Sequence, residues 1–99
     1  MNAMNTAMHV VEAALQGVRD ELAKHQAGLG TLPVPELLPR VESELQAMLA
    51  DLRIGAFVAE RDWIAHSAVD TWPLTHEVTD LVCKAAEAYR RAGRHTQCG

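Results

Sequence analysis

Apolar residues recur every three or four positions along the first quarter of the chain. The row consists of Met4, Met8, Val11, Leu15, Val18 and Leu22. Because an α-helix completes one turn in 3.6 residues, this spacing puts the six side chains on one face, and it predicts a helix from about Asn5 to Gln26. Gly28 and Gly30, followed by prolines at 33 and 35, then predict an extended connector, since a residue before proline avoids the helical conformation.

A second row of apolar residues follows the connector. It consists of Leu38, Val41, Leu45, Met48 and Leu52, and Leu37 and Leu49 widen it. The row predicts a helix that begins near Pro35 or Glu36, with Pro39 in its first turn, where a missing backbone N–H breaks no hydrogen bond. The pattern stops at Ile54 and Gly55. A short or kinked helical segment is then predicted from the apolar residues Phe57, Val58, Trp63 and Ile64.

A third main helix is predicted after a break over residues 70–75. Asp70, Thr71 and Thr75 are each suited to cap this helix, and Pro73 is suited to its first turn. Its apolar row consists of Leu74, Val78, Leu81, Ala85 and Ala92, flanked by Val82 and Tyr89. Gly93 ends the row, and residues 94–99 contain no large apolar side chain. We therefore expect a disordered C-terminal tail over residues 94–99.

These rows predict an all-α fold, in which three main helices and the short or kinked segment form an antiparallel bundle. Each row is too short for a long coiled coil, and the connectors interrupt it, so the helices must pack on one another. We expect one domain over residues 1–93. The expected core includes Leu15, Leu22, Leu45, Leu52, Val78 and Leu81.

The first helix also predicts a homodimer. Its apolar row spans about five turns, or roughly 27 Å, and a bundle of this size would have difficulty covering all of it. An exposed apolar stripe of that length usually marks an interface. The six residues Met4, Met8, Val11, Leu15, Val18 and Leu22 are therefore the interface candidates. The connector would also permit the helix to exchange between two copies.

Composition and charge narrow the class of protein. The net charge is −4, which opposes non-specific attraction to nucleic acid and to anionic lipid. No stretch approaches the 18 or so uninterrupted apolar residues of a membrane span, and no signal peptide is indicated. Cys83 and Cys98 lie far apart, without the cysteine density of a disulfide-rich secreted domain. This spacing favours a cytoplasmic protein.

Two pairs of side chains resemble parts of a metal site. His76 and Asp80 lie four residues apart in the sequence HEVTD, where a zinc protease helix would have two histidines. Asp62 and His66 have the same spacing, and the four together are the candidate ligands of an alternative metal-binding or ligand-binding bundle. Helix capping and surface ion pairs are the default interpretation of these residues.

The remaining polar residues have simpler interpretations. Arg90, Arg91 and Arg94 suit the negative end of a helix dipole, and a nucleic-acid regulator that uses them is a further alternative. His25 continues the first apolar row, which predicts a half-buried histidine at the edge of the core or at a subunit contact. Cys83 is expected to be a small inert side chain.

The sequence contains no complete catalytic, cofactor-binding or metal-binding motif, so we expect no enzyme activity and no cofactor. In size and composition the chain resembles small bacterial accessory proteins such as secretion chaperones and regulators, but no motif identifies a family. The function it favours is a non-enzymatic one, in which an amphipathic helical face binds another protein.

Overall fold

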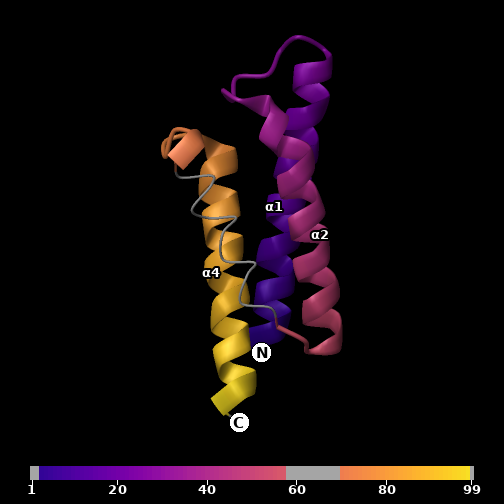
Figure 1. Ribbon diagram of the computed structural model, residues 1–99, viewed down its shortest axis with the longest axis vertical. Coiled ribbons are helices and arrows are strands. Elements are labelled where there is room, and N and C mark those ends of the chain that lie inside the picture. Colours follow the sequence, from indigo (N-terminus) through magenta and orange to yellow (C-terminus); the bar gives the residue numbers. More distant parts are fainter. Residues whose placement is uncertain (1–2, 58–69, 99) are drawn as a thin grey trace.

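The computed structural model describes residues 3–57 and 70–98, and every regular element in them is helical (Figure 1). The elements are α1 (Ala3–Gln26), the short 3-10 helix η1 (Pro35–Leu37), α2 (Leu38–Ile54) and α4 (Glu77–Cys98). They confirm an all-α arrangement of three main helices. The predicted segment with Val58, Trp63 and Ile64 lies outside the described residues.

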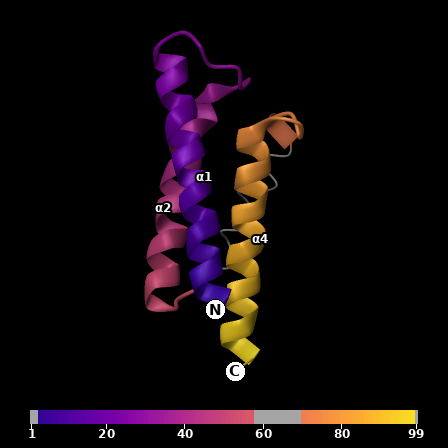
Figure 2. The same cartoon turned by 180° about the vertical axis from the view of Figure 1, so that it is seen from behind.

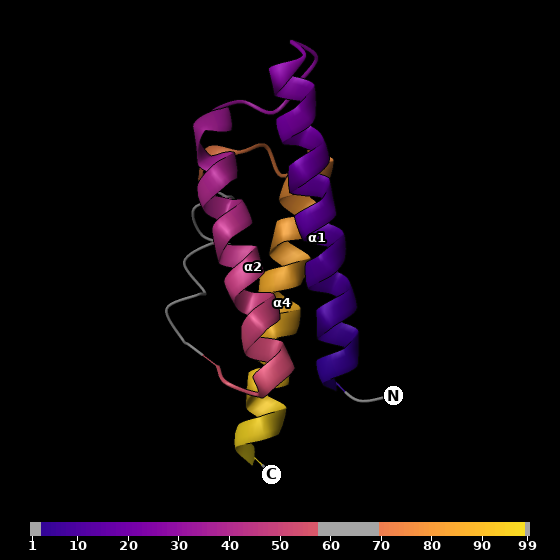
Figure 3. The same cartoon turned by 90° about the vertical axis from the view of Figure 1, so that its right-hand side faces the viewer.

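Helix α1 runs opposite to both α2 and α4, and those two helices run in the same direction (Figures 1 and 2). It packs extensively against α4 and against α2, whereas α2 and α4 contact each other much less (Figure 3). The resulting bundle is elongated, with extents of 47 × 21 × 19 Å. No helix in the described ranges is both long enough and apolar enough to span a membrane.

The core follows the apolar rows closely. Leu15, Leu45, Leu52 and Val78 are buried, as predicted, and Leu22 and Leu81 are partly buried against the same cluster. Gly17 allows α1 to approach α4, because a Cβ atom there would lie 2.6 Å from Cδ1 of Leu81. The two helices therefore meet at a position where only glycine leaves room for the leucine as it is placed.

The C-terminal end of α2 is where the sequence predicts it, whereas the predicted start near Pro35 or Glu36 falls on the 3-10 helix η1, and α2 itself begins at Leu38. Pro39 lies in its first turn, and Gly55 ends it with a φ of 74°, a left-handed conformation that glycine adopts at low cost. The side chain of Tyr89 on α4 also reaches this end of α2, where its hydroxyl donates a hydrogen bond of 2.8 Å to Asp51. Tyr89 packs against Phe57 as well, with ring centroids 5.3 Å apart.

Both ends of α4 differ from the prediction. The helix begins at Glu77, so the predicted row member Leu74 precedes it and is 66% exposed. At the other end the helix continues to Cys98 through residues that the sequence assigns to a disordered tail. Gly93 lies within the helix and is buried beside Phe57, where a Cβ atom would lie 3.0 Å from the ring.

Candidate functional site

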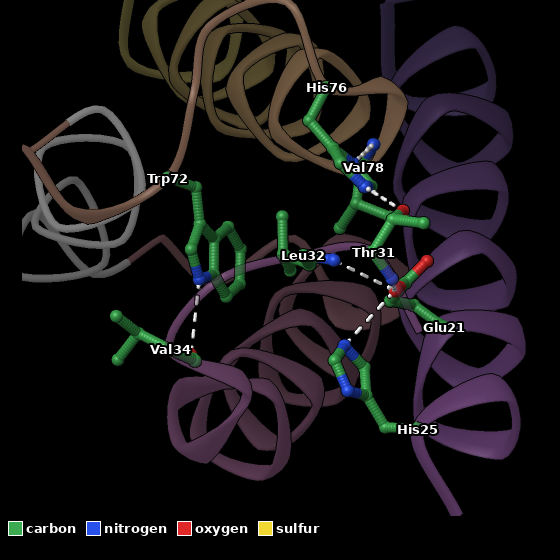
Figure 4. A network of polar contacts seen from close by, with 8 residues as sticks. All are labelled: Glu21, His25, Thr31, Leu32, Val34, Trp72, His76 and Val78. Atoms are coloured by element: carbon green, nitrogen blue, oxygen red, sulfur yellow. Dashed lines mark hydrogen bonds and ion pairs between the residues drawn. The ribbon is translucent and has the colours of Figure 1, made fainter. Parts of the chain in front are cut away.

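A network of polar contacts lies at one end of the bundle, which we call the loop end (Figure 4). The loop end consists of residues 27–37, which connect α1 to α2, and residues 70–76, which precede α4. It lies at the opposite end of the bundle from both chain termini (Figures 1 and 2). There the last turns of α1 meet the connector and the first turn of α4.

Glu21 is the centre of this network. Its side chain is only 3% exposed, and one carboxylate oxygen accepts hydrogen bonds from the backbone N–H groups of Thr31, at 2.9 Å, and Leu32, at 3.2 Å. These amides lie in the connector, where no helix supplies them with a carbonyl acceptor. The carboxylate therefore serves as the hydrogen-bond acceptor for two connector amides, a role that backbone carbonyls have inside a helix.

The same contacts determine the ionisation of Glu21. Burial disfavours the charged carboxylate, but the two amide hydrogen bonds, with smaller contributions from nearby His76 and His25, outweigh that effect. The pKa of Glu21 is therefore lowered from its usual value. At neutral pH the bundle contains a buried carboxylate whose charge is balanced by backbone donors.

His25 is half-buried, one turn beyond Glu21 on the same helix. Its Nε2 atom lies 3.1 Å from the Glu21 carboxylate, a distance at which a protonated ring forms an ion pair, although Nε2 makes no hydrogen bond. The imidazole also lies directly against Gly30. This placement agrees with the expected half-buried histidine at the edge of the core, with the connector as its neighbour.

Position 30 has room only for glycine, because the His25 ring occupies the space beside it. A Cβ atom at position 30 would lie 2.3 Å from two ring carbons of His25. We expect Gly30→Ala to lower the free energy of unfolding by about 1 to 2 kcal/mol, since the ring must leave its place. Chemical denaturation measures this change. In a His25→Ala background the same substitution should cost little, and an equal cost there would contradict the contact.

His76 caps α4, a role that the sequence analysis assigns wrongly to Asp70, Thr71 or Thr75. Its Nδ1 atom accepts a hydrogen bond of 3.1 Å from the backbone N–H of Val78. Nδ1 therefore carries no proton in this arrangement, and Nε2 is the atom that donates to the Thr31 hydroxyl, 3.0 Å away. An imidazole can cap a helix here because the connector offers an acceptor for its second nitrogen.

Trp72 is the third side chain that holds the connector in place, after Glu21 and His76. It is buried, and its indole N–H donates a hydrogen bond of 3.2 Å to the carbonyl of Val34. Val34 has a φ of 51°. That left-handed conformation is unfavourable for a β-branched side chain, and it is retained because the surrounding contacts determine the path of the connector. Trp63, the other tryptophan, lies outside the described residues.

The candidate metal ligands are not brought together where the structure can be described. Asp80 forms an ion pair of 2.8 Å with Lys84, and both ring nitrogens of His76 have hydrogen-bond partners. Asp62 and His66 lie outside the described ranges. Within those ranges no group of three or more His, Cys, Asp or Glu side chains is arranged to hold a metal ion.

The other chemically interesting residues lie on α4. Arg91 pairs with Glu87 at 2.7 Å, Arg90 is exposed, and the side chain of Arg94 is outside the described residues. Cys83 is half-buried, and burial, followed by the charge of Asp80, raises the pKa of its thiol. A raised pKa leaves less reactive thiolate at neutral pH, as expected for a small inert side chain.

The interface candidates of α1 are mostly covered within a single chain. Val11, Leu15 and Val18 are buried by the rest of the bundle, while Met8 and Leu22 are half-buried. The side chain of Met4 is outside the described residues. The row therefore does not form an open stripe where it can be described, and a homodimer built on it stays a prediction.

Glu21 is the residue that the sequence analysis missed. A second row on α1, offset from the first, places small or apolar residues at Ala7, Val11, Ala14 and Val18, and its next position is Glu21. A carboxylate at a core position signals a buried polar contact.

Comparisons with known protein families, curated proteins and solved structures find no match to this chain.

Proposed function

We propose that this chain is a non-enzymatic helical bundle that acts by binding another protein through its loop end. The observation that carries the proposal is the position of exposed apolar side chains. Leu29 is 72% exposed and Leu74 is 66% exposed, and Val34 is also exposed. All three belong to the loop end, whereas Ile54, the other large apolar side chain exposed in the described residues, ends α2 at the opposite end.

The two loops that carry these side chains are held together. Trp72 bonds to the carbonyl of Val34, and His76 bonds to the hydroxyl of Thr31. Single exposed apolar residues are common on protein surfaces, but several on adjoining, fixed loops are more typical of a binding surface. A rigid surface is also favourable for binding, because little conformational entropy is lost when a partner docks.

The polar network favours a structural role over catalysis. One oxygen of the buried Glu21 carboxylate accepts two amide hydrogen bonds, and both ring nitrogens of His76 are engaged. A general acid or base needs to reach a substrate proton. Here the Glu21 oxygen and Nδ1 of His76 bind backbone amides, and Nε2 of His76 binds the Thr31 hydroxyl, so these groups support the loops that carry the surface.

The test compares charge substitutions at the two ends of the bundle. The tagged parent chain is used to capture its partner protein from a lysate of its source organism. We expect a tagged Leu29→Glu/Leu74→Glu variant to capture at least tenfold less of that partner. Ile54→Glu is the matched control, because Ile54 is 78% exposed and lies far from the loops. Helicity should be the same in all three chains. Equal capture by the double variant and the control would refute the loop end as the binding surface.

A further inference from the structure

We propose that His76 makes partner binding at the loop end depend on pH, because a proton taken up by its ring removes the cap of α4. This regulation rests on the proposed function, since it concerns the same surface. His76 is well placed for it. The residue belongs to the loop that carries Leu74, and its ring contacts Thr31 in the other loop of the surface.

The cap of α4 needs a ring nitrogen that carries no proton. Nδ1 of His76 accepts a hydrogen bond of 3.1 Å from the backbone N–H of Val78. A protonated imidazole has an N–H group at both nitrogens, so the Nδ1–H group would face the amide N–H of Val78 and no hydrogen bond could form. A positive charge is also unfavourable at the first turn of a helix, which is the positive end of its dipole. Protonation of His76 therefore breaks this contact.

The buried carboxylate of Glu21 favours the protonated ring. The charge of His76 is one of the smaller causes of the lowered pKa of Glu21, and the attraction between two charges acts on both of them. The Val78 amide and the Glu21 carboxylate thus have opposite effects on a proton at His76. The protonated ring can remain in the folded bundle by turning from the amide toward the carboxylate. The change is then local and does not require α4 to unfold.

His25 is the second titratable group that faces Glu21. A proton on its Nε2 atom, 3.1 Å from the carboxylate, would add an ion pair without breaking a hydrogen bond, because Nε2 makes none. Protonation of His25 therefore strengthens a contact, whereas protonation of His76 breaks one. The remaining charged groups near this end on the described elements are exposed, so solvent and salt screen them. They are Lys24 on α1, Glu36 on η1, Arg40 on α2, Asp70 before α4, and Glu77 and Asp80 on α4.

Loss of the cap also loosens the attachment between the two loops. Nε2 of His76 donates to the hydroxyl of Thr31, and this bond ends when the ring turns toward α1. The bond from Trp72 to the carbonyl of Val34 contains no titratable group and remains. Leu74 lies two residues before His76, so its position relative to the connector is less fixed in the protonated chain. A partner that contacts both loops then binds more weakly, because binding must restore the lost order.

The first experiment needs no partner. NMR of the isotope-labelled chain reports whether each ring nitrogen of His76 carries a proton, and it is recorded from about pH 8 to about pH 5, across the range in which histidine titrates. We expect Nδ1 to be unprotonated at the upper end. The amide resonance of Val78 should move as Nδ1 takes up its proton, with the same midpoint. A proton on Nδ1 at the upper end, or an amide resonance that stays constant while Nδ1 is protonated, would overturn the proposal.

His76→Asn is the matched variant for this titration. The amide oxygen of asparagine can accept the Val78 N–H, as it does at many helix N-termini, but it takes up no proton in this range. The Val78 amide resonance should therefore stay nearly constant in His76→Asn. In His25→Gln it should still move with the proton of His76, because the cap is retained. Movement that follows His25 instead would contradict the role of His76.

The second experiment compares capture of the loop-end partner at about pH 7.5 and about pH 5.5, on either side of the usual titration of histidine. We expect the parent to capture about fivefold less at the lower pH, an effect comparable to the loss of one helix cap. His25→Gln should behave like the parent, and His76→Asn should show no comparable fall. An equal fall in the parent and in His76→Asn would place the pH dependence elsewhere and overturn the proposal.

The outcomes separate this inference from the proposed function. If capture depends on Leu29 and Leu74 but its pH dependence does not depend on His76, only the inference fails. If the Leu29→Glu/Leu74→Glu variant captures as much as Ile54→Glu, the surface is refuted and its regulation with it, whatever the titration shows. If His76→Asn loses helicity, the titration of the parent decides. Equal midpoints for Nδ1 and the Val78 amide then support the proposal, and different midpoints overturn it.

Discussion

Leu45→Ala is expected to lower the free energy of unfolding by roughly 2 to 5 kcal/mol. Leu45 lies in the middle of α2 with 0% of its surface exposed, so the truncation removes buried methyl groups and leaves a cavity that the neighbouring helices fill only in part. In a domain of this size the melting temperature should fall by about 10 °C or more. Thermal and urea unfolding followed by circular dichroism measure both quantities.

Ile54→Ala is the matched control for this prediction. It removes a comparable amount of apolar side chain from the same helix, but Ile54 is 78% exposed. Its effect should stay within about 0.5 kcal/mol, as is usual for surface positions. Equal losses at positions 45 and 54 would show that α2 does not bury the face we describe.

The main helices could be predicted because their apolar rows follow the period of an α-helix over several turns. The apolar row of α2 and its interruption at Gly55 are local signals, and the structure confirms both. The start of α4 could not be found in this way. Asp and Thr, the residue types at positions 70 and 75, are commoner helix caps than His. His76 caps α4 through one ring nitrogen, while its second ring nitrogen donates to the hydroxyl of Thr31, which lies 45 positions earlier in the sequence.

The candidate site was harder to predict for the same reason. Its bonds join residues that are distant in the sequence, such as Trp72 and Val34, which lie 38 positions apart. Periodicity reports which face of a helix is buried, but it does not report which neighbour covers that face. This is also why the row on α1 predicted a contact between two chains, whereas α2 and α4 of the same chain bury Val11 and Val18.

Glu21 should make the stability of the bundle dependent on pH. Its pKa is lowered in the folded state, so its contribution is fully present above the pKa of the unfolded chain and is lost as the pH falls through the folded value. At pH 7, we expect Glu21→Gln to be less stable than the parent by about 1 to 3 kcal/mol, since hydrogen bonds to a charged acceptor are stronger than those to an amide.

This difference should shrink on acidification from roughly pH 5 downward, where glutamic acids begin to take up protons. Urea unfolding at several pH values, at a concentration low enough to keep the chains monomeric, measures it. Glu12→Gln, at an exposed position, should stay close to the parent throughout. If the difference in unfolding free energy between the parent and Glu21→Gln were the same at pH 3 as at pH 7, the carboxylate charge would not be what holds the connector. The contribution of Glu21 would then come from packing alone.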